Sequence, residues 1–208
     1  MSSLNDEFLE QLSSAAPAPG GGAACAYAGA LASALGSMVA NLTIGKKGYE
    51  DYDAQMCEAR DTLARCRERL VSLVEEDACA FNAIAASWRM PKSTKREQAI
   101  RHKAEQDALV AACEVPLQIM RICAKIIEID ELLAHNGNRN VLADAGACAV
   151  LSKAAIQAAA LGVYTNTSHM DDLDLADEYD EQAYDLVSTF GARADELYAY
   201  VSNGVVAP

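Results

Sequence analysis

Asp77 is the residue whose position most clearly suggests chemistry. Apolar residues lie four and seven positions to either side of it, so a helix would place its carboxylate at the centre of an apolar face. That face is made by Leu63, Cys66, Leu70, Leu73, Phe81 and Ile84. A buried carboxylate needs a hydrogen-bond donor, a cation or a proton. The pattern therefore indicates a general acid/base, an anchor for a ligand N–H group, or a structural carboxylate that a neighbouring helix satisfies.

A second acidic residue, Asp144, lies near the start of another predicted helix. An acidic side chain there is favoured by the helix dipole alone, which is a purely structural explanation. However, Val141, Cys148 and Leu151 share its helical face. We therefore also expect Asp144 to point toward the core side of its helix.

Two loops carry backbone or amide groups suited to ligand binding. The run Gly20-Gly21-Gly22 opens a helix, where free N–H groups can hold a carboxylate or phosphate, although a flexible turn is the alternative. No Gly-Lys-Ser/Thr follows it, so it is not a P-loop. In the loop Gly137-Asn138-Arg139-Asn140, one asparagine can cap the next helix, and Asn136 or Asn138 can adopt a left-handed conformation. The spare amides offer donors and acceptors to the edge of a heterocycle.

The elements that must position these residues are predicted to be helices. Helical periodicity and Pro/Gly breaks predict helices over about 4–14, from the glycines to 44, 52–88, 93–133, 141–164 and 178–200, with an acidic loop at 171–177. Residues 1–208 thus predict a single domain of the all-α class, a bundle of long antiparallel helices. The second helix has a large apolar stripe opposite a strip of small residues, so we expect it to be buried all round. Close packing of alanine-rich helices also predicts a homodimer.

Composition limits the possible partners and the cellular compartment. The 208 residues carry a net charge of −13, which disfavours nucleic acid as a partner. Seven cysteines without a C-x-x-C pair and three histidines at unrelated spacings predict free thiols in a reducing compartment and no metal site. Residues 11–45 are uncharged but rich in Ala, Gly and Ser, so we expect a buried helix and not a membrane span. Because the segment Met1–Glu10 is acidic, it does not look like a secretory signal, and we expect a cytoplasmic protein.

Several motifs in order along the chain resemble the cyclodeaminase domain of the formiminotransferase-cyclodeaminase family and its standalone bacterial relatives. The resemblance covers nearly the whole chain. Its motifs are Pro17-Ala18-Pro19-Gly20-Gly21-Gly22, Val39-Ala40-Asn41-Leu42-Thr43-Ile44-Gly45-Lys46-Lys47, Asp77 with Ala80-Phe81, Arg101, Gln106, Val115-Pro116, and Gly137-Asn138-Arg139-Asn140 with Asp144-Ala145-Gly146.

This resemblance implies an all-α fold, a dimer with the active site near the subunit contact, and a tetrahydrofolate substrate. It implies one of two reactions, neither of which needs a metal or redox cofactor. A cyclohydrolase interconverts 5,10-methenyltetrahydrofolate and 10-formyltetrahydrofolate, whereas a cyclodeaminase closes 5-formiminotetrahydrofolate to the methenyl compound with release of ammonia. The chain is too short to include a formiminotransferase domain, which favours the cyclohydrolase.

The resemblance also transfers a set of site residues to matching positions. It implies Asp77 and Asp144 as catalytic residues and, as substrate-binding residues, Gly20, Gly21, Gly22, Asn41, Lys46, Gly137, Asn138 and Asn140. We hypothesise that the two acids move protons or balance the methenyl cation. The asparagines would orient the pterin, and the glycine turn and Lys46 would hold oxygen or carboxylate groups. This hypothesis requires the two acids to meet in one sheltered cleft.

Three positions depart from the family pattern. Ala23 and Ala143 stand where the family often has serine, and Met170 replaces the second asparagine of the tail motif that begins at Asn166. These departures favour the alternative of a non-catalytic helical dimer that binds folate or a partner protein.

Overall fold

The chain folds into long helices with short connections. The computed structural model describes residues 4–206, and no strand occurs in that range. The elements are α1 (Leu4–Leu12), α2 (Gly21–Asn41), η1 (Glu50–Tyr52), α3 (Asp53–Trp88), α4 (Lys95–Asn136), η2 (Arg139–Val141), α5 (Leu142–Thr167) and α6 (Leu173–Val206). The predicted all-α bundle is confirmed. Of the segment Met1–Glu10, the first three residues lie outside the described range.

Local capping explains where the predicted boundaries were wrong. Thr94, and not Ser93, caps α4: its side chain accepts from the Glu97 N–H, while the Glu97 carboxylate accepts from the Thr94 N–H at 2.9 Å. The predicted acidic loop at 171–177 is mostly helix, because α6 starts at Leu173. The Asp172 carboxylate accepts from the Leu175 N–H at 3.1 Å, so an acidic residue starts this helix.

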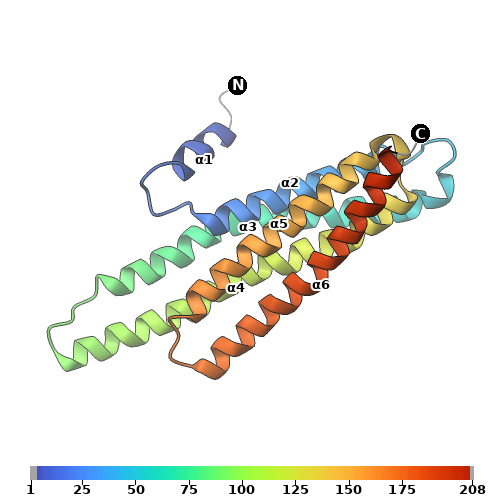
Figure 1. The fold of residues 1–208 in the computed structure, drawn as a ribbon. Helices are drawn as coiled ribbons and strands as arrows, with labels where there is room; N and C mark the ends of the chain where they lie inside the picture. Colours follow the sequence, from blue (N-terminus) through green and yellow to red (C-terminus); the bar gives the residue numbers. More distant parts are fainter. Residues whose placement is uncertain (1–3, 207–208) are drawn as a thin grey trace.

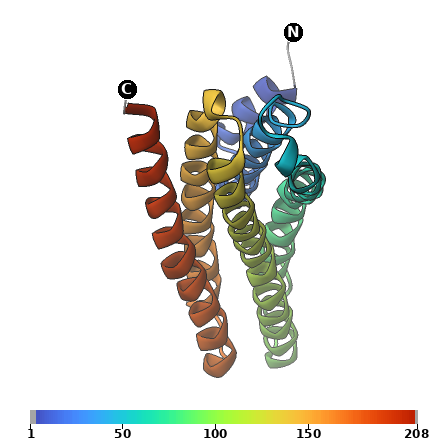
Figure 2. The same cartoon turned by 90° about the vertical axis from the view of Figure 1, so that its right-hand side faces the viewer.

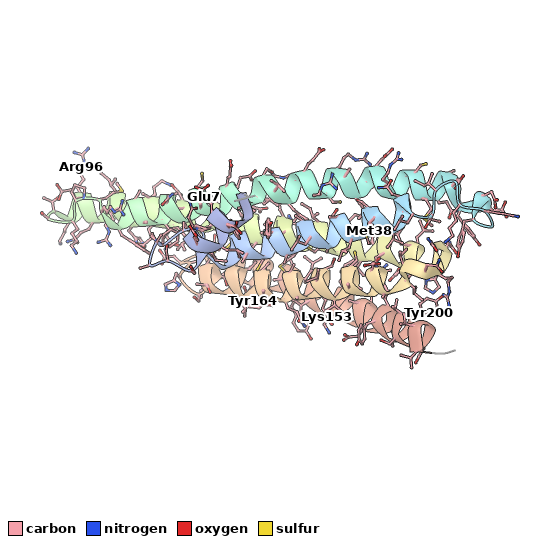
Figure 3. All side chains as sticks on the ribbon, turned by 90° about the horizontal axis from the view of Figure 1, so that it is seen from above. Glu7, Met38, Arg96, Lys153, Tyr164 and Tyr200 are labelled. Atoms are coloured by element: carbon pink, nitrogen blue, oxygen red, sulfur yellow. The ribbon has the colours of Figure 1, made fainter. Side chains whose placement is uncertain are left out.

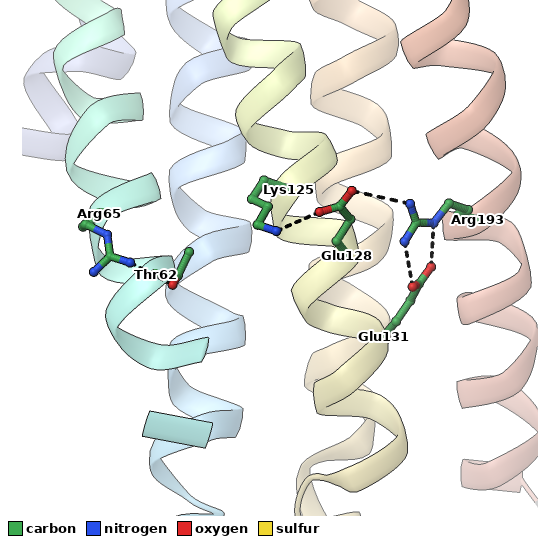
Figure 4. Close-up of polar contacts among 6 residues, drawn as sticks. All are labelled: Thr62, Arg65, Lys125, Glu128, Glu131 and Arg193. Atoms are coloured by element: carbon green, nitrogen blue, oxygen red, sulfur yellow. Dashed lines mark hydrogen bonds and ion pairs between the residues drawn. The ribbon is translucent and has the colours of Figure 1, made fainter. Parts of the chain in front are cut away.

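The five long helices lie side by side (Figures 1 and 2). α2 packs between α3 and α5, α4 lies against α3 and α5, and α6 covers α5 and α4. Figure 3 shows the length of the bundle, with Arg96 at one end and Tyr200 at the other. An ion-pair network fastens α6 to α4 (Figure 4): the Arg193 guanidinium donates to both oxygens of Glu131 at 2.8 Å and also pairs with Glu128.

The small residues of α2, and not its large ones, face the core. A Cβ added at Gly29 would lie 2.7 Å from Cys123 Sγ, and one at Gly36 would lie 3.0 Å from Leu63. Close helix approach therefore requires glycine at these positions. Leu31, Met38 and the following Leu42 point outward instead, with Leu31 48% and Leu42 47% exposed. The prediction that α2 is buried all round is wrong within one chain.

Two helices are long and apolar enough to cross a membrane by composition alone. They are Gly21–Asn41 and the stretch Arg139–Thr167, and 61% and 50% of their most apolar windows are buried in the bundle. Helices packed in a protein core show the same property. Packing in the bundle therefore explains the apolarity of the larger part of α2.

The core contains one acidic residue that the sequence analysis missed. Asp130 of α4 is fully buried, and neither carboxyl oxygen has a hydrogen-bond partner within residues 4–206. Burial raises the pKa of Asp130 well above its ordinary value, because a low-dielectric interior disfavours the charged carboxylate. All seven cysteines are free, and the thiol of Cys148 lies beside this group.

Candidate active site

Asp77 of α3 meets the first turn of α2. The Ala23 N–H donates to Asp77 Oδ2 at 3.0 Å. Gly20, the N-cap residue of α2, makes no side-chain capping bond, so Asp77 caps this helix from its neighbour. The positive end of the helix dipole faces the carboxylate. The predicted need of Asp77 for a donor is therefore met by backbone.

Gly22 allows this close approach. A Cβ at Gly22 would lie 2.0 Å from Asp77 Oδ1, which no real side chain tolerates, whereas a Cβ at Gly21 would have nothing within 4 Å. The glycine run is thus more than a flexible turn. Gly21 and Gly22 differ, because only at Gly22 does a neighbouring side chain, that of Asp77, require glycine.

A cavity of about 750 Å³ opens beside this contact, and we name it the Asp77 cleft. Its walls come from the glycine turn and from α2, α3, α4 and α5. Alanine is the commonest lining residue, and Phe81, Ile84 and Leu161 are the larger apolar ones. Among residues 4–206, Asp77 is the one charged residue that lines it. Its volume and apolar walls are typical of sites for small organic ligands.

The surroundings of Asp77 shift the pKa of its carboxyl group. Burial raises the pKa of Asp77 above the ordinary 3.8, and the hydrogen bond from Ala23 opposes this rise. Cys25 also lines the cleft. Burial, together with the charge of Asp77, raises the pKa of the Cys25 thiol to about 11. At neutral pH Cys25 is therefore a neutral thiol and not a nucleophile.

The remaining predicted site residues gather at the other end of α2. Asn41, Lys46, Asn140 and Asp144 lie around its C-terminal end and the start of α5, as do Gly137 and Asn138. α2 has 21 residues, so roughly 30 Å separates the two ends. The prediction that Asp77 and Asp144 meet in one cleft is wrong within a single chain, because the two residues lie at opposite ends of α2.

Asn138 has a structural role at this second end. Its amide Nδ2 donates to the Leu42 carbonyl at 2.9 Å, while its Oδ1 accepts from Lys46 Nζ and from the Asn140 N–H. Its backbone N–H donates to Thr43 Oγ1. The amide joins the α2 C-terminus to the start of α5. Its oxygen accepts two hydrogen bonds, and one of its two Nδ2 hydrogens is used in the bond to Leu42.

Other details of this loop also differ from the prediction. Asn138 has φ −60°, and positive φ within residues 4–206 occurs only at Gly45 and Gly48. No asparagine there adopts the predicted left-handed conformation. Gly137 has an ordinary φ of −82°, but a Cβ on it would lie 2.3 Å from the Leu133 carbonyl oxygen. Asn41 and Asn140 are exposed.

Comparison with known proteins places this geometry in a family. The family model described as formiminotransferase-cyclodeaminase matches residues 5–185. The chain belongs to this family. It is 38% identical to a methenyltetrahydrofolate cyclohydrolase of Methylorubrum extorquens, over 96% of both chains. It is 30% identical to the formimidoyltransferase-cyclodeaminase of Mus musculus, covering 93% of this chain and 35% of the mouse protein.

A solved family structure has the same fold. The formiminotetrahydrofolate cyclodeaminase of Thermotoga maritima superposes with a TM-score of 0.80 at 29% identity, covering 97% of this chain and 94% of that one.

Sequence reasoning omitted several residues that line the Asp77 cleft. Ala112 and Pro116 of α4 and Thr165 and Asn166 of α5 all contribute to its wall. Pro116 inside a predicted helix was the available signal, because a mid-helix proline frees a backbone carbonyl. Asn166 was noted only as part of a family motif.

The glycine contact gives the first prediction. Gly22→Ala should lower the free energy of unfolding by about 1–3 kcal/mol, since Asp77 must leave the first turn of α2 to admit the new Cβ. Gly21→Ala is the matched control, with open space at its Cβ, and should change it by less than about 1 kcal/mol. Urea denaturation of both variants measures the difference. Equal stability of the two would show that Gly22 does not contact Asp77.

Proposed function

We propose that this family member is a methenyltetrahydrofolate cyclohydrolase whose reaction takes place in the Asp77 cleft. The similarity to the M. extorquens cyclohydrolase along the full length of both chains supports the substrate. The observation that carries the assignment is the single carboxylate of an apolar cleft, held against a helix N-terminus. Acid/base work on a flat heterocycle needs those two features.

The reaction adds water to the methenyl carbon between N5 and N10 of the folate. The Asp77 carboxylate accepts a proton from water as the oxygen bonds to this carbon, giving a tetrahedral intermediate. The bond from carbon to N5 then breaks, and protonated Asp77 returns its proton to N5. The formyl group stays on N10 as the hydroxyl proton leaves, so that one water is consumed and one proton is released overall.

The surroundings of Asp77 suit both the cationic substrate and the oxygen that bonds to its methenyl carbon. The methenyl substrate is a cation, and the carboxylate would balance its charge in a cleft with little water. Gly21 and Gly22 line the cleft at the first turn of α2, where helix N–H groups point outward. They would hold the oxygen as negative charge develops on it. Because Ala23 reaches Asp77 through its backbone, alanine in place of the family's serine leaves this contact intact.

Cyclodeaminase activity is the second candidate, favoured by the likeness to the T. maritima structure. Closing the formimino compound passes through a similar tetrahedral carbon, with ammonia as the leaving group in place of water. The methenyl absorbance separates the two. Its accelerated loss from methenyltetrahydrofolate supports the cyclohydrolase, and its accelerated gain from 5-formiminotetrahydrofolate, with ammonia, supports the cyclodeaminase. No acceleration in either assay would leave only the non-catalytic dimer.

We also propose a homodimer formed through the outer face of α2 and α5. Its large apolar residues are exposed in one chain, namely Leu31, Met38, Leu42, Val150 and Leu161. α2 has no charged residue along its length. Such a face on two adjacent helices is typical of a subunit contact.

A two-fold axis near the middle of α2 would make the two copies of this helix antiparallel. The C-terminal end of α2 in one copy would then lie near the Asp77 cleft of the other copy. Both this end and the cleft are about half of 30 Å from the axis. Lys46, Asn140 and Asp144 would thus complete the partner's cleft. This arrangement accounts for family motifs at both ends of one helix.

Removing the charge of Asp77 tests the mechanism. Asp77→Asn keeps an acceptor for the Ala23 N–H, and should lower kcat by about 10²–10⁴-fold on methenyltetrahydrofolate. The exposed Asp185 provides a control, since Asp185→Asn should leave kcat unchanged. Because the carboxylate is the active form and its pKa is raised, wild-type kcat/KM should fall as the pH drops through a value above 3.8. Near-normal turnover by a folded Asp77→Asn protein contradicts the mechanism.

A charge on the outer face of α2 tests the dimer. Leu31 is the middle residue of α2 and is 48% exposed, so Leu31→Glu would place two like charges near the axis. Sedimentation should show a dimer dissociation constant raised by at least about tenfold. Val71 on α3 is 53% exposed, and Val71→Glu should leave the dimer intact. A Leu31→Glu protein that dimerises like wild type would disprove this interface.

A further inference from the structure

Pro116 leaves a gap in the hydrogen bonding of α4. It lies inside this helix, and proline has no N–H to donate to the carbonyl four residues earlier. That carbonyl belongs to Ala112, and both residues line the Asp77 cleft. A backbone acceptor without its helical partner is therefore present at the wall of the cleft.

Asn166 of α5 fills this gap. Its side-chain Nδ2 donates to the Ala112 carbonyl at 3.0 Å. A carbonyl accepts only from the nitrogen of an amide, so the contact fixes which way the amide is turned. The helix defect at Pro116 thus orients a polar side chain at the wall of a mostly apolar cleft.

The fixed orientation leaves the Asn166 oxygen available. Within residues 4–206 no donor reaches Oδ1, and this atom is not among the solvent-inaccessible polar atoms that lack a partner. Asn166 lines the cleft from α5, whereas Asp77 lines it from α3. Polar side chains from two different helices therefore line the cleft, and Asp77 and Asn166 can both accept a hydrogen bond. A neutral amide acceptor suits a ligand N–H without demanding a charge.

We propose that Asn166 Oδ1 accepts a hydrogen bond from an N–H of the substrate's reduced pterin ring. This inference rests on the proposed function, since the methenyl substrate carries such donors at N3, at N8 and on the 2-amino group. Asn166 is then a residue that determines specificity, and Asp77 stays free for the proton transfers. A ring that lacks the matching N–H would leave the amide oxygen unpaired in the cleft and bind more weakly.

Binding of tetrahydrofolate and three analogues tests the proposal. The analogues lack the 2-amino group, the N3–H or the N8–H in turn, and calorimetry gives each dissociation constant. The wild-type protein should bind at least one analogue about tenfold more weakly than tetrahydrofolate. Asn166→Ala should reduce that preference to within about twofold, while any preference due to Asp77 persists. Wild-type protein without any preference, or Asn166→Ala protein that retains every preference, would overturn the proposal.

A second variant separates recognition from folding. Asn166→Ala leaves the Ala112 carbonyl without its donor, which costs stability. Pro116→Ala in the same chain supplies an N–H at position 116 that bonds this carbonyl within α4. The double variant should recover the melting temperature lost by Asn166→Ala but should not recover the analogue preference. Recovery of both would mean that Asn166 only supports the helix, and would overturn the proposal.

Turnover of methenyltetrahydrofolate by wild-type protein, measured in parallel, separates two kinds of failure. If wild-type protein neither binds tetrahydrofolate nor accelerates the reaction, the proposed function fails and this inference falls with it. If wild-type protein is active and Asn166→Ala keeps its preferences, only the inference fails.

Discussion

The contact between Asp77 and the first turn of α2 is the interaction on which the rest of the site depends. It joins α3 to the N-terminus of a helix that has no cap of its own. It requires glycine at position 22 and keeps a carboxylate at the wall of an apolar cleft. The Ala23 N–H stabilises the ionised form, whereas burial raises the pKa. The balance of the two effects leaves the pKa of Asp77 above the ordinary value for an aspartate.

The small residues of α2 also help to bring about this contact. Gly29 and Gly36 let α2 approach Cys123 and Leu63 closely, which brings its N-terminus against Asp77. Leu31 and Met38 of α2 consequently face outward. Fold, site and proposed dimer contact thus depend on one helix that has small residues on one side and large apolar residues on the other.

The helices and Asp77 could be predicted from sequence because periodicity and Pro/Gly breaks are local signals. Asp77 lies on its apolar stripe in the structure as the pattern predicted. The meeting of Asp77 with Asp144 could not be tested locally, because family motifs preserve order along the chain and not distance. The contacts of Asn138 could not be predicted, because an amide's partners come from a distant segment, here Leu42 and Lys46. The contact of Asn166 could not be predicted, because its partner, the Ala112 carbonyl, is freed by a proline on another helix. The single domain, the homodimer and the cytoplasmic location stay predictions.

NMR titration of protein labelled with ¹³C at the aspartate carboxyls tests the central claim most directly. The Asp77 signal is assigned by its loss in Asp77→Asn, and the Ala23 amide is followed in the same samples. The account predicts that Asp77 titrates above the ordinary 3.8 and that the Ala23 amide shifts with the same midpoint. An Asp77 midpoint at or below 3.8, or an Ala23 amide that does not respond, would contradict it.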